Sequence, residues 1–352
     1  MQFLRGFPLV VLLLIFSVSV RAQEEHGAQK AEEQFDPSSF ILDHIADSHE
    51  WHILTKKNGE SLAIYLPVIL YSREKGIDIF TSRKLAHGHE YKGYKLEEEG
   101  ELKGKIVSVN EDGTAIKGNL PLDFSITKTV VGMMAAGLIG LLLFISLARS
   151  YKRTGISHPK GIQSFLEPVV LFIRDDIAVP NLGIPRYEKY MPYLLSAFFF
   201  ILINNLMGLI PFPPPFGANV TGNIGVTFVL AVCTYLITQF SGNKAYWKHI
   251  FAAPGVPFWL LPVLIPVELI GTISKPFALM IRLFANITAG HIIVLSLICL
   301  IFIFDSLAVA PVSIFFVIFM DCLELLVAFL QAYIFTLLSA LFIGMAVPEE
   351  HH

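Results

Sequence analysis

The segment "RLFANITAGHIIV", residues 282–294, places a positively charged side chain inside a strongly apolar part of the chain. It belongs to a run, residues 276–304, in which His291 is the only other titratable side chain of note. A guanidinium group is protonated at any physiological pH, and at the centre of a bilayer it costs roughly 2.5–3.5 kcal/mol on insertion scales. Because intramembrane charges usually mark transport sites, Arg282 indicates a membrane protein that handles ions.

The overall composition also indicates a membrane protein. Of the 352 residues, 54% are hydrophobic and only 16% are charged, which is more apolar surface than a soluble domain could bury. The formal net charge of −3 favours neither a nucleic-acid partner nor an acidic one. The cysteines lie in apolar segments without CxxC spacing, so the sequence predicts neither a disulfide framework nor a metal site.

The first 22 residues, "MQFLRGFPLVVLLLIFSVSVRA", have the layout of a cleaved signal peptide, with Arg5 before an apolar stretch and Ala22 at the end. The alternative is an uncleaved anchor helix, although the apolar stretch is short for a span. Cleavage predicts that residue 23 and those after it begin outside the cytoplasm.

Residues 23–127 carry much of the charge and contain no spanning segment. The turn signals "KKNGES" and "NEDGTA" are flanked by β-branched and apolar residues and predict two β-hairpins in a small extracytoplasmic domain. Irregular spacing favours ordinary surface histidines over a metal cluster for the five histidines of this region, which are His44, His49, His52, His87 and His89.

A first membrane span is predicted at residues 129–148, and the basic residues after it place its end in the cytoplasm by the positive-inside rule. The segment "GIQSFLEPVVLFIRDDIA", residues 161–178, is typical of an amphipathic helix on the membrane surface. Residues 191–211 then run outward and residues 223–240 return inward.

The last third of the chain departs from this simple alternation. Residues 256–274 carry three prolines and Glu268, which predicts a broken segment low on the inner side rather than a full crossing. Residues 276–304 and 311–347 would be helices of about 43 and 55 Å, against about 30 Å of hydrocarbon. The sequence therefore predicts an all-α polytopic membrane protein with about five crossing helices, of which the last two are long and strongly tilted or bent.

Helical periodicity relates the polar residues of these last two helices. Arg282 and Asn286 share a face, and His291 lies on the opposite side about 13.5 Å further outward. On the returning helix, Glu324 and Gln331 share a face about 10.5 Å apart. If Gln331 is level with Arg282, then Glu324 and His291 lie at similar depth, as two groups of a proton relay would.

Each of these residues also has a structural interpretation. Arg282 could snorkel to a surface or form a buried ion pair with Glu324, and His291 could be a satisfied core histidine. Glu268 could lie at an interface, where carboxylates are ordinary. The two amides, of Asn286 and Gln331, could simply link helices by hydrogen bonds.

The motif "SKPFALMIRLFANITAGHI", residues 274–292, followed by "ELLVAFLQAYIF", residues 324–335, resembles subunit a of the F-type (FoF1) ATP synthase. The resemblance covers roughly residues 128–347 and is to the bacterial type, here with an N-terminal extracytoplasmic extension. It implies a stator proton channel beside a rotating c-ring. With the observations above it divides the chain into a signal peptide (1–22), an extracytoplasmic domain (23–127), a membrane channel domain (128–347) and a cytoplasmic tail (348–352).

The resemblance also implies roles for particular residues. In the order of the family's motif, the essential arginine is Arg282, its neighbour is Asn286, the facing glutamine is Gln331, the relay pair is His291 and Glu324, and the inner access residue is Glu268. The implied partners are the c-ring, peripheral-stalk subunit b, the rest of the ATP synthase and membrane lipid, in a bacterial plasma membrane. No phosphate-binding loop is visible, so ATP chemistry would belong to other subunits and no cofactor is expected.

Two other functional classes are less well supported. An ion-coupled transporter would usually show inverted repeats with paired broken helices, and the sequence contains no such duplication. An intramembrane metalloprotease would need HExxH on a helix, and "GHIIVL" lacks the glutamate. The role of residues 23–127 is open, and a cap over the outer half-channel or a contact with other stator parts is the working hypothesis.

Overall fold

The computed structural model describes residues 36–55, 61–73, 75–98, 100–110, 120–154, 161–210, 214–251, 257–306 and 308–347. Residues from Pro37 onward form one compact unit. The predicted signal peptide, residues 1–22, and the tail, residues 348–352, lie outside the described residues.

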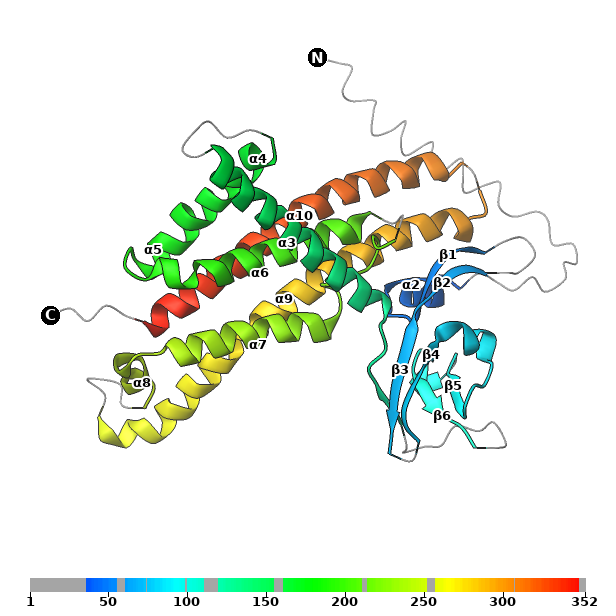
Figure 1. The fold of residues 1–352 in the computed structure, drawn as a ribbon, viewed down its shortest axis with the longest axis horizontal. Helices are drawn as coiled ribbons and strands as arrows, with labels where there is room; N and C mark the ends of the chain where they lie inside the picture. The colour runs from blue at the N-terminus through cyan, green and yellow to red at the C-terminus, as the bar shows by residue number, and fades with distance from the viewer. Residues whose placement is uncertain are drawn as a thin grey trace, which may run out of the picture. The chain divides into compact units, whose positions relative to one another are not determined.

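Five of the described helices are long and apolar enough to cross a membrane (Figure 1). They are α3 (Lys128–Thr154), α6 (Tyr187–Leu209), α7 (Ile224–Ser241), α9 (Leu261–Ile303) and α10 (Ala310–Ala346). The predicted fold class, a polytopic α-helical membrane protein with a small β-containing N-terminal part, is confirmed.

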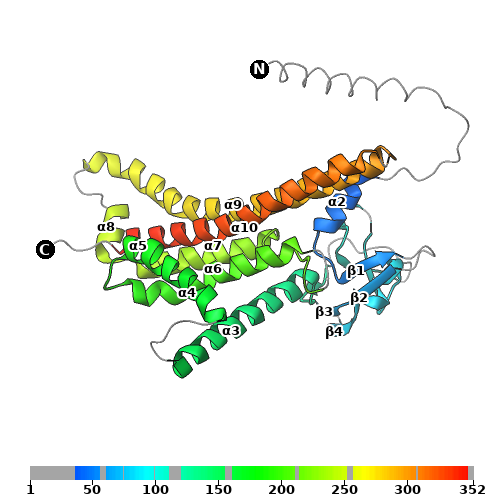
Figure 2. The same cartoon turned by 90° about the horizontal axis from the view of Figure 1, so that it is seen from above.

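Helix α9 is continuous over 43 residues, although Pro266 and Pro276 lie inside it. The predicted break before residue 276 is therefore wrong. A proline removes one backbone hydrogen bond and bends a helix without having to end it, and Pro262 lies in the first turn, where the missing N–H costs little. Figure 2 shows the resulting bend in the N-terminal half of α9, drawn in yellow.

Helix α10 spans 37 residues, close to the predicted range of 311–347. It packs against both α9 and α6. Small side chains make the contact close, since Ala328, Ala332 and Ala340 are fully buried, and α6 contributes the fully buried Leu194 and Phe198. Small residues allow helices in membranes to approach each other closely, so one face of α10 packs tightly on the rest of the bundle.

The predicted amphipathic helix over residues 161–178 is present, but only part of it is a surface helix. It consists of α4 (Ile162–Phe172), a π-helical continuation (Ile173–Ala178) and α5 (Val179–Leu182). Phe165 is 76% exposed, whereas Ile173 and Ile177 are fully buried against α6 and α10. The second half of the segment thus belongs to the core of the bundle.

Among its described residues, the N-terminal part contains one α-helix, seven short strands and three single-turn 3-10 helices. The α-helix and the strands are α2 (Pro37–Ile45), β1 (Glu50–Thr55), β2 (Ser61–Tyr65), β3 (Pro67–Ser72), β4 (Gly76–Thr81), β5 (Tyr94–Leu96), β6 (Ile106–Ser108) and β7 (Leu122–Asp123). The sheets are antiparallel, with β1 beside β2, β3 between β4 and β7, and β5 beside β6. A short helix, α8 (Lys244–Phe251), follows α7 in the membrane part.

One of the two predicted hairpins is confirmed. Strands β1 and β2 pair on either side of "KKNGES", as predicted. The turn "NEDGTA" falls largely in residues 111–119, outside the described part, so the second hairpin stays a prediction. Of the described strands nearest to it, β6 pairs with β5 and β7 with β3. Ile106 of β6 joins Tyr94 of β5 in a core with Val68 and Leu70.

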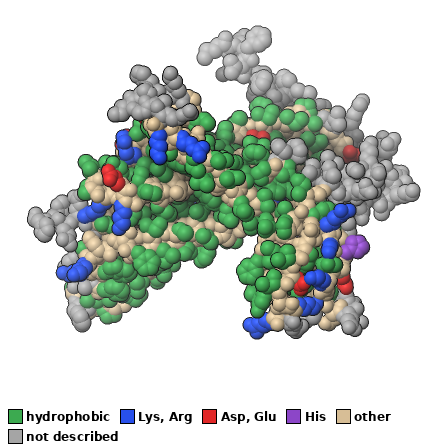
Figure 3. All heavy atoms as spheres, viewed as in Figure 1, with side chains coloured by type: hydrophobic (Ala, Val, Ile, Leu, Met, Phe, Trp, Pro, Cys, Tyr) green, Lys and Arg blue, Asp and Glu red, His purple; other side chains and the backbone are tan. Residues whose placement is uncertain are grey.

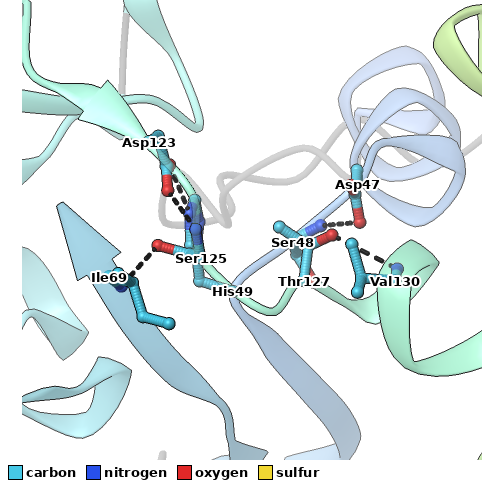
Figure 4. A network of polar contacts seen from close by, with 8 residues as sticks. All are labelled: Asp47, Ser48, His49, Ile69, Asp123, Ser125, Thr127 and Val130. Carbon is cyan, nitrogen blue, oxygen red and sulfur yellow. Dashed lines mark hydrogen bonds and ion pairs between the residues drawn. The ribbon is translucent and has the colours of Figure 1, made fainter. Parts of the chain in front are cut away.

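A chain of polar contacts joins this domain to the segment that leads into α3 (Figure 4). His49 Nε2 lies 2.8 Å from Asp123 Oδ2, and Asp123 Oδ1 accepts a hydrogen bond of 2.8 Å from the Ser125 backbone. The Ser125 hydroxyl in turn accepts a bond of 3.1 Å from the backbone of Ile69 in β3. The prediction of a surface histidine is wrong for His49, which is buried because Asp123 compensates its desolvation.

Asp123 contributes to stability in a pH-dependent way. Burial would raise the pKa of Asp123, but hydrogen bonds from His49 and Ser125 outweigh it and hold that pKa below its ordinary value of 3.8. A carboxyl group with a lowered pKa stabilises the fold above its ordinary pKa, and the contribution is lost as the pH falls through the lowered value. The contacts of Asp123 with His49 and Ser125 are therefore intact at neutral and mildly acidic pH.

The first turn of α3 is capped by residues that precede the domain's strands. Asp47 Oδ1 accepts hydrogen bonds of 3.0 Å from the backbone nitrogens of Ser48 and Thr129, and the Ser48 carbonyl accepts one of 2.9 Å from Lys128. The first N–H groups of a helix have no partner within it, so these bonds fasten the N-terminal domain to a membrane helix.

Asp47→Ala should therefore destabilise the protein by about 1 kcal/mol, the usual value of a lost helix cap, while Asp47→Asn keeps most of the stability. The measurement is thermal unfolding of the detergent-purified chain. The control is Asp43→Ala, because Asp43 forms an exposed ion pair of 2.6 Å with Lys103, and such pairs contribute little. Equal effects of Asp47→Ala and Asp43→Ala would contradict the capping role.

Candidate functional site

Arg282 lies on a face of α9 that no other described part of the chain covers. Its side chain and that of Asn286 are exposed, while Leu279, Leu283 and Ile287 on the other side of the helix are buried. Within the described residues, the Arg282 guanidinium has no hydrogen bond or ion pair. The proposed ion pair with Glu324 is thus not formed, and the guanidinium projects from an apolar surface without compensation.

Gln331 of α10 lies beside Arg282, but it contacts the backbone. The Gln331 side chain is buried, and its Nε2 donates a hydrogen bond of 3.2 Å to the Arg282 carbonyl oxygen. This bond sets the level of α10 against α9 and leaves the guanidinium unpaired. The register assumed from helical periodicity, with Gln331 level with Arg282, is therefore the one observed.

His291 and Glu324 meet further along the same two helices. His291 Nδ1 lies 3.3 Å from Glu324 Oε1, and the Glu324 side chain is only 6% exposed. A buried carboxyl group needs a polar partner to offset its desolvation, and the imidazole provides it. The helical period predicted that these two residues lie at one depth, and in the structure their side chains are in contact.

One glycine makes room for this pair, and a second lies in ordinary contact distance of it. A methyl group at Gly290 would lie 2.9 Å from Glu324 Oε1, which is closer than side chains allow, so a larger residue would displace the carboxylate. A methyl group at Gly208 of α6 would lie 3.7 Å from His291 Nε2. Sequence reasoning assigned no role to either residue; the only available signal was a glycine directly before a membrane histidine.

Buried amide and hydroxyl groups surround the pair. The Asn205 side chain donates a bond of 3.1 Å to the Ala328 carbonyl of α10 and accepts one of 2.6 Å from the Thr221 hydroxyl. Within the described structure, the buried atoms Asn204 Oδ1 and Thr288 Oγ1 have no protein partner. Buried polar atoms of this kind are normally satisfied by water, so this side of the bundle suits a hydrated path.

Glu268 lies 14 residues before Arg282, about 21 Å along α9. It lines a cavity of about 560 Å³ formed with α7, α8 and the end of α10. The polar lining residues are Tyr235, Thr238, Gln239, Tyr246, Lys248, His249, Thr272 and Lys275. Two polar regions thus lie on opposite sides of Arg282 along α9, and the structure does not bring Glu268 together with His291 or Glu324.

The glycine beside Glu324 allows a direct test of this packing. Gly290→Ala should lower the thermal stability of the detergent-purified chain, because the added methyl group displaces a buried carboxylate. Gly271→Ala, on the same helix with open space around it, should instead raise stability by up to about 1 kcal/mol through helix propensity. Stabilisation by both variants would show that Gly290 has no packing role.

Comparison with known sequences identifies two families in the chain. The family described as ATP synthase A chain matches residues 130–344, and one described as a domain of unknown function (DUF8433) matches residues 40–124. The first match covers the five long helices almost completely. The second covers most of the N-terminal strands.

Several curated relatives are called ATP synthase subunit a. The protein of Chloroherpeton thalassium is 49% identical over 236 residues, which cover 65% of this chain and 69% of that protein. That of Chlorobium phaeobacteroides strain BS1 is 51% identical over 237 residues (65% and 68%), and that of Myxococcus xanthus is 46% identical over 253 residues (69% and 80%). The chain is therefore a multi-pass membrane protein of the ATP synthase subunit a family.

Proposed function

We propose that this chain is the stator proton channel of an F-type ATP synthase in a bacterial plasma membrane. It provides two offset half-channels that load and unload protons on a rotating c-ring. The observation that carries this proposal is the exposed guanidinium of Arg282 on an apolar helix, without a partner among the residues that the structure describes. Such a group is costly in lipid, and a partner that brings a carboxylate to it offsets that cost.

Arg282 separates the two half-channels. As each ring carboxylate passes, the fixed positive charge favours its ionised form, so the proton is released before the arginine is reached. A permanent cation also repels protons and cannot relay them. Each proton that crosses contributes about 2.3 kcal/mol per 100 mV, so leakage past Arg282 would waste the stored energy.

The outer half-channel passes through His291 and Glu324. An imidazole within 3.3 Å of a carboxyl group can exchange a proton with it near neutral pH. The buried amide of Asn205 and hydroxyl of Thr221 line the way. Asn286, one helical turn from Arg282 and equally exposed, would contact the ring beside it.

The inner half-channel opens through the cavity that Glu268 lines. Its polar walls and volume of about 560 Å³ suit a water-filled access path. The carboxylate of Glu268 attracts protons electrostatically and draws them from the ring towards the cytoplasm. The offset between this cavity and the His291–Glu324 pair makes a proton travel around the ring to cross the membrane.

The uncovered faces of the last two helices suit the ring as partner. Large apolar side chains of α10 are exposed at helical spacing, among them Phe315, Phe319, Leu326 and Phe329, and Phe277 and Ile281 of α9 are exposed as well. A ring of apolar helices would cover this surface, with the long α9 and α10 inclined across it. Subunit b, the rest of the ATP synthase and membrane lipid complete the proposed surroundings.

Charge distribution supports an orientation with the N-terminal domain outside and the C-terminus in the cytoplasm. Figure 3 shows basic side chains gathered at the end of the bundle that carries α4 and α5. The exposed basic residues at the helix ends on this side are Arg149, Lys152, Lys189, Lys244 and Lys248. By the positive-inside rule that end is cytoplasmic.

Arg282→Ala should abolish ATP-driven acidification of inverted membrane vesicles while the c-ring still co-purifies with the chain. Arg282→Lys should restore little, because lysine lacks the planar geometry and the fixed charge of arginine. Ser274→Ala is the control, since the Ser274 hydroxyl is exposed and bonds only its own helix at Gly271. Unchanged pumping in Arg282→Ala, or no ring in the wild-type preparation, would refute the proposal.

Glu324→Gln should slow pumping roughly 100-fold, the loss typical of a missing proton-transfer group, without loss of assembly. Asp305→Asn removes the same charge from an exposed carboxylate between α9 and α10 and should pump at the wild-type rate. Dye quenching in vesicles that contain equal amounts of complex measures both. A wild-type rate for Glu324→Gln would exclude it from the relay.

A further inference from the structure

The N-terminal domain is seated on the ends of the membrane helices nearest to His291. Trp51 of β1 is buried against Ala218 and Val220 in the α6–α7 loop. Helix α2 packs against α9, and Figure 2 shows it beside the C-terminal part of that helix. The domain is therefore in direct contact with the α6–α7 loop and with α9, which lie beside the outer polar region.

Helix α2 brings a second histidine towards His291. His44 is the next-to-last residue of α2, it is exposed, and its ring stacks on Phe40. The Lys128 ammonium group, at the start of α3, donates a hydrogen bond of 3.3 Å to the His44 carbonyl oxygen. Through Trp51 the domain also approaches His291: a methyl group at Gly208 would lie 3.5 Å from the carbonyl oxygen of Ala218, on which Trp51 packs, and 3.7 Å from His291 Nε2.

We propose that residues 37–127 form the outer vestibule of the proton path and that His44 is its proton-collecting group, which delivers protons to His291. This inference rests on the proposed outer half-channel and adds the group that precedes its relay pair. It assigns a function to the region that matches a domain of unknown function.

The chemistry of the vestibule suits proton collection. An exposed imidazole exchanges protons with water, and an imidazole normally titrates between pH 5 and 8, which makes it an efficient carrier near neutral pH. The bond from Lys128 and the cap from Asp47 hold the end of α2 over the start of α3. His44 is thereby kept at the rim of the path, between water and the membrane histidine.

The charged groups around this path determine its dependence on pH. His291 contacts Glu324 on α10, with Asp321 one turn away from Glu324. On the domain's side, α2 packs against α9 and carries His44, whose carbonyl is bonded by Lys128 of α3. Close to His44 lie Asp43, paired with Lys103, and Asp47 at the cap of α3. Free protons become scarce as the outer pH rises, so a collecting group matters more at high than at low outer pH.

The test uses the complete ATP synthase in proteoliposomes, with ATP synthesis driven by an imposed gradient and with the pH on the domain's side varied from about 6 to about 8. The His44→Ala and His44→Gln variants should both synthesise ATP several-fold more slowly than the wild type at about pH 8. At about pH 6 the difference from the wild type should be much smaller. His89→Ala removes an exposed histidine from the same domain and should match the wild type throughout.

Imidazole added on the domain's side distinguishes a proton-carrying role of His44 from a purely structural one. A mobile imidazole should restore synthesis in His44→Ala, and it should not restore synthesis in Glu324→Gln. If His44→Ala matches His89→Ala at every pH while Glu324→Gln is still blocked, the vestibule inference is overturned and the half-channel proposal stands. A slow His44→Ala that imidazole does not rescue and pH does not modulate also overturns it. If Glu324→Gln is fully active, the half-channel proposal itself fails.

Discussion

The guanidinium of Arg282 is the group on which the arrangement of this protein depends. It occupies a helix face that the described chain leaves uncovered, on a helix whose exposed side chains include Phe277 and Ile281. A fixed cation there is costly in hydrocarbon, and within the described chain nothing compensates it. In the function proposed above, another molecule supplies the counterion, and a carboxylate that arrives and leaves repeatedly meets that requirement while the charge blocks the passage of protons.

The neighbouring packing keeps the guanidinium of Arg282 apart from the titratable groups. Gln331 donates its hydrogen bond to the Arg282 carbonyl, so that the guanidinium stays unpaired among the described residues and α10 is fixed at the level where Glu324 meets His291. The titratable groups therefore form two separate sets, one around Glu324 and one around Glu268. The close approach at Gly290 belongs to the same design, because a buried carboxyl group can contact His291 only where the helices come near each other.

The relative levels of the polar residues could be predicted from the sequence where the helices are regular. The 3.6-residue period was enough to place Glu324 level with His291 and Gln331 level with Arg282, because both helices are regular over this part. It failed at Pro276, since a proline in a helix held by tertiary contacts bends it without ending it. It also failed for the burial of His49, which depends on contacts distant in sequence. The close packing at Gly290 and the proposed role of His44 could not be predicted from the sequence, because both follow from which helices lie side by side.

The central claim is that Arg282 separates two proton half-paths. The most direct measurement is the decay of an imposed proton gradient across sealed vesicles that contain the intact ATP synthase, with nucleotide withheld so that the ring does not turn. Wild-type vesicles should hold the gradient, Arg282→Ala vesicles should lose it, and adding Glu324→Gln to Arg282→Ala should restore much of the retention by closing the outer half-path. Equal retention by wild type and Arg282→Ala would contradict the account.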